Sequence, residues 1–163
     1  MKVEKSLKLF IVLALFLFAS CNKNNDIVQE DKSLIFQFQR SGGWVGLNEK
    51  MEINTDSTHY VISYHELGAS ETTRNYQTTI KTSATVWNNL VKTFNVETFA
   101  KIQDGPCSSC VDGYDEIFSV TQDTTHYSFY NGGGDENFQQ MQDFFNIIYE
   151  QLDFFENQTG FNK

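Results

Sequence analysis

The chain contains little proline, little basic charge and no hydrophobic run long enough to cross a membrane. Its single proline is Pro106, so few of its turns are fixed by a locked backbone angle. Twelve Lys and Arg residues stand against 21 Asp and Glu residues, which gives a net charge of −9. Because that charge repels phosphate groups, we expect no nucleic-acid partner. The N-terminal apolar run, residues 9–18, is shorter than the ~20 residues of a membrane-spanning helix.

Histidine and cysteine are also scarce, and the common zinc motifs are incomplete. His65 and Glu66 match the start of the zinc-protease motif, but Ala69 stands where the second histidine is needed. Cys107 and Cys110 have no second pair of cysteines or histidines at close spacing, which a four-ligand zinc site requires. No serine or cysteine lies in a recognisable nucleophile context. We therefore expect no catalytic residue, no metal, no cofactor and no enzymatic activity.

The N-terminus has the features of an export signal. Three lysines precede the apolar run, and the small residues Ala19 and Ser20 separate that run from Cys21. A small pair directly before a cysteine resembles the lipobox of bacterial lipoproteins. The resemblance implies cleavage before Cys21 and acylation of its thiol and its new amino group. The alternative is an ordinary signal peptide followed by an incidental cysteine.

These observations divide the chain into four parts. Residues 1–20 are expected to be a lipoprotein signal peptide, 21–32 a flexible polar tether, 33–155 a single domain and 156–163 a polar tail. Since the mature chain is strongly acidic, its attachment to a membrane would depend on acyl chains and not on a basic patch. We expect a location in the bacterial cell envelope, on the outer membrane, with the domain outside the cytoplasm.

Alternation of apolar and polar residues predicts six strands. The clearest case is residues 34–40, where Leu34, Phe36 and Phe38 share one face and Gln37 and Gln39 the other. The predicted strands are residues 34–40, 50–55, 59–64, 72–80, 114–122 and 125–130. The last two flank a turn at residues 123–124 and are therefore expected to form a hairpin.

Two segments change to a helical period. Residues 83–95 predict an amphipathic helix with Thr82 or Ser83 as N-cap. A long final helix is predicted after residues 131–134, and it has one apolar stripe, formed by Phe138, Met141, Phe145, Ile148, Leu152 and Phe155. Residues 96–102 are ambiguous. The sequence thus predicts an α+β domain, a mainly antiparallel sheet with two amphipathic helices packed on one face.

The Cys107-Ser-Ser-Cys110 segment lies in a predicted loop and allows several interpretations. In an exported protein the first expectation is a disulfide between the two cysteines. A redox motif, free thiols and a metal site are the alternatives. A redox motif would place its first cysteine at a helix N-terminus, and no helical pattern follows Cys110.

Residues 40–46 read Arg-Ser-Gly-Gly-Trp-Val-Gly and have the character of a family signature. A strand that ends in this way resembles the emfourin family, small inhibitors of thermolysin-type metalloproteases. The resemblance extends more loosely over residues 34–152, and the chain differs from it in its lipid anchor, its longer 55–80 region and its cysteine loop. It implies a secreted metalloprotease as the protein partner. The expected partner-binding residues are Arg40, Ser41, Gly42, Gly43, Trp44 and Gly46.

The residues themselves favour a binding turn for physical reasons. Gly42 and Gly43 allow a positive φ or a close approach of a partner backbone, and Trp44 offers a large contact area. The alternative is a turn whose tryptophan covers the core. At the level of function, the alternative to a protease inhibitor is a structural or envelope-assembly lipoprotein without catalytic activity.

Overall fold

The structure is a computed structural model that describes residues 33–42, 46–65 and 73–160. These residues form six strands, four α-helices and two 3-10 turns. The strands are β1 (Ile35–Gly42), β2 (Leu47–Ile53), β3 (Ser57–His65), β4 (Thr73–Lys81), β5 (Tyr114–Gln122) and β6 (Thr125–Tyr130). The helices and 3-10 turns are α2 (Ala84–Thr93), α3 (Val96–Phe99), η1 (Ser109–Val111), η2 (Gly132–Gly134), α4 (Glu136–Gln140) and α5 (Gln142–Thr159).

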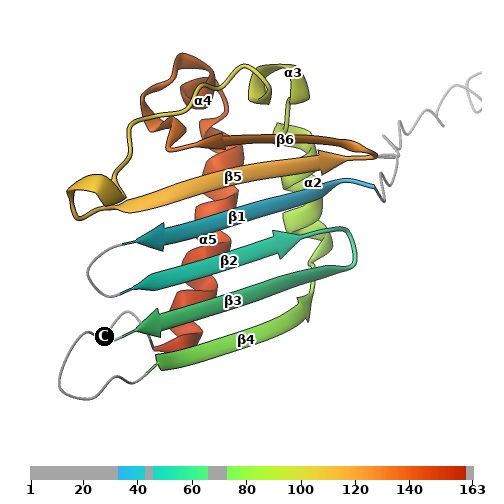
Figure 1. Cartoon of the computed structure of the whole chain (residues 1–163). Helices are drawn as coiled ribbons and strands as arrows, with labels where there is room; N and C mark the ends of the chain where they lie inside the picture. The colour runs from blue at the N-terminus through green and yellow to red at the C-terminus, as the bar shows by residue number, and fades with distance from the viewer. Residues whose placement is uncertain (1–32, 43–45, 66–72, 161–163) are drawn as a thin grey trace, which may run out of the picture.

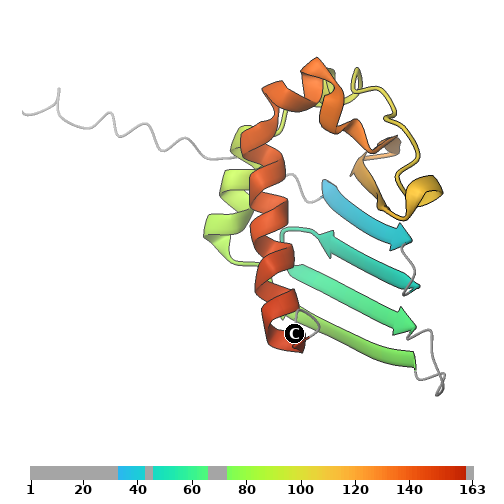
Figure 2. The ribbon, with the colours of Figure 1, turned by 90° about the vertical axis from the view of Figure 1, so that its left-hand side faces the viewer.

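All six strands belong to one antiparallel sheet with the order β4-β3-β2-β1-β5-β6. The long helix α5 runs across the strands on one face, with α2 beside it, and the other face carries no helix of the described chain (Figures 1 and 2). This arrangement confirms the predicted α+β architecture. It gives the sheet a covered face, against the helices, and an open face.

The alternation read from the sequence decides which side chains enter the core. Phe36 and Phe38 on β1 are 1% and 2% exposed and face the helices, whereas Gln37 and Gln39 lie on the open face. Phe118 of β5 packs edge-on against Phe38, with ring centroids 5.1 Å apart. Burial of such rings is the main source of stability in a domain of this size.

The first predicted helix is confirmed, and its N-cap is Ser83. The Ser83 hydroxyl accepts a hydrogen bond from the Val86 N–H and so satisfies a donor that the first helical turn leaves free. The ambiguous stretch contains α3, in which Phe99 is buried. Asn95 caps α3 by accepting a hydrogen bond from the Thr98 N–H.

The last helix differs from the prediction in its continuity. The six residues of the apolar stripe are all buried as expected, but the helix is interrupted at Met141, which has φ −102° and ψ 18°. Asp135 caps the short α4, and Phe138 stacks on Phe145 of α5 with 4.1 Å between ring centroids. Two helices that meet at Met141 therefore replace the expected single helix.

The expected polar tail also begins later than residue 156. Helix α5 continues to Thr159, and Gly160 ends it with a positive φ of 67°. Glu156 is mostly buried because its carboxylate is paired with Arg40 under the helix. Four of the residues assigned to the tail, 156–159, thus belong to helix α5.

Several sequence predictions fall outside the described residues. These are the signal peptide, the tether, the acylation site Cys21, and the turn residues Gly43 and Trp44.

Candidate functional site

Arg40 is at the centre of a polar cluster between the sheet and the end of α5. Its neighbours in register are Glu49 on β2 and Glu116 on β5, and Glu156 lies above them on α5. Arg40 Nη1 is 3.2 Å from Glu49 Oε2 and 3.0 Å from Glu156 Oε1, and Nε is 3.1 Å from Glu116 Oε1. One guanidinium therefore serves three carboxylates from three different elements.

Two tyrosines complete this group. The Tyr60 hydroxyl donates to Glu49 Oε1 at 2.7 Å, and the Tyr149 hydroxyl donates to Glu116 Oε2 at 2.7 Å. We call the six residues the Arg40 cluster: Arg40, Glu49, Tyr60, Glu116, Tyr149 and Glu156. Every side-chain nitrogen and oxygen atom that is fully buried in the described structure has a hydrogen-bond partner.

Burial shifts the protonation equilibria in this cluster. Burial raises the pKa of Glu49 from an ordinary 4.5 to about 7, although hydrogen bonding by Tyr60 and the charge of Arg40 act in the opposite direction. Burial by itself would lower the pKa of Arg40, but the three surrounding carboxylates raise it. Burial, together with the neighbouring glutamates, raises the pKa values of Tyr60 and Tyr149. Both tyrosines remain neutral donors as a result.

The cluster places Arg40 differently from the role expected for it. The side chain is only 21% exposed, and its guanidinium is occupied by carboxylates of its own chain. A guanidinium held in this way fastens α5 to the sheet and offers little to a partner. Arg40 therefore has a structural role near the end of β1, where it joins α5 to the sheet.

The predicted turn joins two strands that are paired along their full length. Pairing of β1 with β2 runs from Phe36 opposite Ile53 to Gly42 opposite Leu47, so both ends of the turn are anchored in the sheet. Ser41 also pairs with Asp115 on the other side, because β1 is an interior strand. Gly46 closes the turn with φ 57°, a conformation that few side chains tolerate.

The space beside Gly42 is used by the chain itself. Its φ is 119°, and a Cβ atom added there would lie 3.0 Å from the Ser109 Cβ and 3.1 Å from the Gly113 carbonyl oxygen. The absence of a side chain at Gly42 thus lets the cysteine loop pack against β1. Gly42 and the cysteine loop are far apart in the sequence but are neighbours in the structure.

Asp115 holds the cysteine loop in this position. Its Oδ1 accepts hydrogen bonds from the backbone N–H groups of Ser108 and Ser109, at 2.8 and 3.1 Å, and from Asn131 Nδ2 at 2.9 Å. The Ser109 hydroxyl donates to Oδ2. Hydrogen bonds from Ser109 and Tyr130 hold the pKa of Asp115 well below its usual range.

Within the loop the two cysteines lie at bonding distance. The Cys107 and Cys110 sulfur atoms are adjacent, and their Cα atoms are 5.5 Å apart. This geometry suits the predicted disulfide, whose presence in the exported protein stays a prediction.

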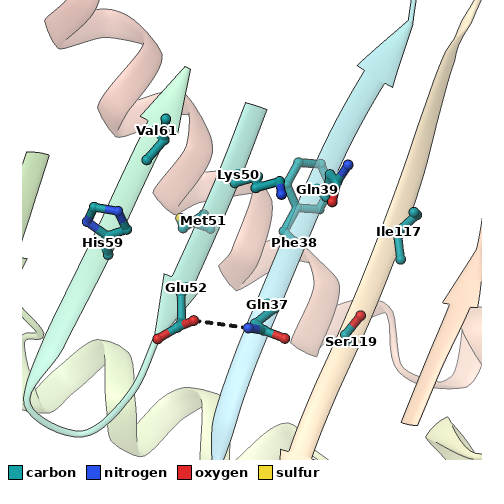
Figure 3. Close-up of a pocket in the computed structure, with 10 residues that line it drawn as sticks. All are labelled: Gln37, Phe38, Gln39, Lys50, Met51, Glu52, His59, Val61, Ile117 and Ser119. Atoms are coloured by element: carbon teal, nitrogen blue, oxygen red, sulfur yellow. Dashed lines mark hydrogen bonds between the residues drawn. The ribbon is translucent and has the colours of Figure 1, made fainter. Parts of the chain in front are cut away.

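The open face of the sheet carries a shallow hollow of about 240 Å³. Figure 3 shows the residues that line it. Gln37 Nε2 donates to Glu52 Oε2 across this surface at 3.0 Å, and Lys50, His59 and Ser119 lie around the pair. The lining is a mixture of amide, acidic, basic and hydroxyl groups with apolar residues such as Val61 and Ile117. It contains no convergent set that favours one ligand.

Two further observations concern metal binding and membrane-spanning helices. Among residues 33–42, 46–65 and 73–160, no group of three or more His, Cys, Asp or Glu side chains is arranged to hold a metal ion. None of the helices in those ranges is long and apolar enough to cross a membrane.

The comparisons with protein families and with curated proteins give no match. No protein-family model matches the chain, and no curated protein matches it.

Proposed function

We propose that this protein is a lipid-anchored binding protein of the bacterial envelope and that the turn between β1 and β2 is its binding element. The observation that carries the proposal is the anchoring of that turn by strands paired up to Gly42 and Leu47, with the Arg40 cluster beneath them. A turn held on a rigid element loses little entropy when a partner binds. The protein has no catalytic role in this proposal.

The partner that we propose is a thermolysin-type metalloprotease, and the support is the resemblance of residues 40–46 to emfourins. The proposed contact residues are Gly43 and Trp44, since Arg40 and Gly42 are engaged inside the domain and His65 lies beside Gly46. The competing function, a structural or envelope-assembly lipoprotein, is favoured by one observation. The glycine at position 42 makes room for Ser109 and Gly113 of the same chain, which needs no external partner.

Inhibition separates these two functions. The detergent-purified lipoprotein should inhibit thermolysin-type proteases, and Trp44→Ala should weaken the complex by about 2 kcal/mol, roughly thirtyfold, with an unchanged melting temperature. Phe154→Ala serves as the matched control, because Phe154 is an exposed aromatic residue near Ile80, at the other end of the sheet. It should inhibit as the wild type does.

Two outcomes would contradict the inhibitor proposal. Absence of inhibition by the wild type removes the protease as partner. If Trp44→Ala instead unfolds the domain, the tryptophan belongs to the core and the turn is not the binding element.

The lipid anchor has an independent test. Cys21→Ala should abolish metabolic labelling with a fatty acid and move the protein out of the detergent phase, because the acidic chain has no basic patch to hold it on a membrane. The control is the double variant Cys107→Ala/Cys110→Ala, which removes the other two cysteines and should label normally. Labelling that survives Cys21→Ala would show that Cys21 is not the acylated residue.

A further inference from the structure

The edge strand β4 is long and chemically unprotected. It has one hydrogen-bonded neighbour in the described sheet, β3, and most of its nine residues are exposed. Its central residues 75–79 include no charge, proline or glycine, which are the features that usually block pairing at a sheet edge. No strand of the described residues pairs with its outer backbone edge, which is therefore available to another strand.

The opposite edge of the sheet is shorter and is covered at one end. Strand β6 has six residues, and its last residue, Tyr130, is satisfied by a neighbouring loop. The Tyr130 N–H donates to Asp104 Oδ1 at 2.9 Å, and its carbonyl accepts a hydrogen bond from the Gly105 N–H at 2.6 Å. Of the two edges, β4 thus offers the longer strand to a partner.

An apolar groove lies beside the open edge on the helix side. Ile80 of β4 is 36% exposed and Phe154 of α5 is 45% exposed, and both line a groove of about 410 Å³ together with Glu150. Large apolar side chains exposed at the rim of a groove mark an interaction surface more often than isolated ones do.

The charged side chains near the two ends of β4 are a further feature of this edge. Arg74 is exposed and has the same parity as Tyr76, which packs on Tyr60 against the helices, so Arg74 also belongs to the helix side. The three ion pairs among the described residues all belong to Arg40, so none of them engages Arg74 or Glu150. Arg74 therefore lies near one end of β4, and the groove at the other end is lined by both the Glu150 carboxylate and Lys81.

We propose that β4 pairs with β4 of a second copy of this chain, antiparallel and about a two-fold axis at Gln77. This register matches all nine residues of each strand, Thr73 to Lys81, and places the helices of both copies on the same side of one continuous sheet. It sets Arg74 opposite Ile80 of the second copy, beside the groove that contains Glu150 and Phe154. No like charges face each other directly, because Lys81 falls opposite Thr73.

The two-fold axis gives a sharp cross-linking test in the membrane-bound full-length protein. Directly opposed Cβ atoms lie about 5 Å apart, so Gln77→Cys should be joined to its copy by a short bismaleimide. Thr79→Cys is the matched control on the same strand and the same face. In this register the two copies of residue 79 are about 13 Å apart along the strands, so that variant should cross-link at least fivefold less.

Charge reversal tests the groove within the same assay. In the Gln77→Cys background, Arg74→Glu should reduce the cross-linked fraction about fivefold, because it places two carboxylates together in each half of the interface. Adding Glu150→Arg should restore the fraction. Lys92→Glu on α2, an exposed reversal away from β4, should leave it unchanged.

The results that overturn this inference are equally specific. No cross-link at Gln77 means that β4 does not pair with itself. Equal cross-linking at Thr79 and Gln77 excludes this register, and a failure of Glu150→Arg to restore Arg74→Glu removes the groove from the interface.

Discussion

Replacement of Arg40 by alanine should lower the free energy of unfolding by about 3 kcal/mol at pH 8. The reason is that Glu49, whose side chain is 0% exposed, would lose the guanidinium with which it forms an ion pair. A buried carboxylate without its cation must either remain charged in a poor solvent or take up a proton, and both cost free energy at this pH. The loss should be smaller at pH 6, where proton uptake is easier.

Urea unfolding of the full chain at the two pH values measures this effect. Lys92→Ala is the control, because Lys92 is an exposed cation on α2, outside the Arg40 cluster, and its effect should stay within about 0.5 kcal/mol. Arg40→Lys should fall between the two, since a lysine keeps the charge but cannot serve three carboxylates with one planar group. A loss below about 1 kcal/mol for Arg40→Ala would show that the cluster contributes little to stability.

Strand parity alone could have located much of the Arg40 cluster. Arg40 follows Leu34, Phe36 and Phe38 at intervals of two, so its side chain had to face the helices. The same alternation places Glu49 on the inward face of its strand, two residues before Met51 and four before Ile53. It also places Glu116 inward, two residues before Phe118 and four before Val120. Three charged residues at inward positions signal a buried ionic group even without knowledge of the partners.

The pairing between these charges could not be predicted in the same way. It depends on strand order, and β1 lies between β2 and β5 although residues 54–113 separate β2 from β5 in the sequence. Glu156 was hidden for another reason, because its polar character and its place after the last apolar residue suggested a tail. Long-range register decides such contacts, and local periodicity carries no information about it.

The glycines show a second limit of local reasoning. A glycine with a positive φ is compatible with a binding turn and also with close internal packing, and the sequence pattern is the same for both. At Gly42 the structure fills the space with Ser109 and Gly113, which lie some 70 positions later in the chain. At Gly46 a Cβ atom would lie 3.1 Å from the Cβ of His65, so internal packing contributes there too.

The pH dependence of stability should be dominated by Glu49 between pH 8 and pH 5. Its folded-state pKa of about 7 lies above the ordinary 4.5, so the folded protein binds a proton more readily than the unfolded chain does. The free-energy cost of burying this carboxylate in its charged form is fully present above pH 7. It disappears as the pH falls from 7 towards 4.5. Stability should therefore rise on acidification by up to about 3 kcal/mol, at about 1.4 kcal/mol for each pKa unit.

The raised pKa of Glu49 is the balance between burial and the groups around its carboxylate. Arg40 and the Tyr60 hydroxyl favour its charged form, whereas Glu156 on α5 opposes it, and burial exceeds all of them. Asp115 has the opposite effect on the pH dependence of stability. Because its pKa is lowered in the folded protein, its carboxylate stabilises the fold at pH values above its ordinary pKa, and this contribution is lost only at more acidic pH. The rise from Glu49 should thus be visible before the acid side of the profile begins to fall.

Urea unfolding at half-unit steps from pH 8 to pH 5 tests this prediction with two variants of one strand. Glu49→Gln removes the titrating group while keeping an acceptor for the Tyr60 hydroxyl, so its stability should change little over the range. Glu52→Gln is the matched control on the open face of β2, and it should keep the wild-type slope because it leaves Glu49 and its partners unchanged. Wild-type stability that falls steadily from pH 8 to pH 5 would mean that Glu49 is ionised throughout, with Arg40 outweighing the effect of burial.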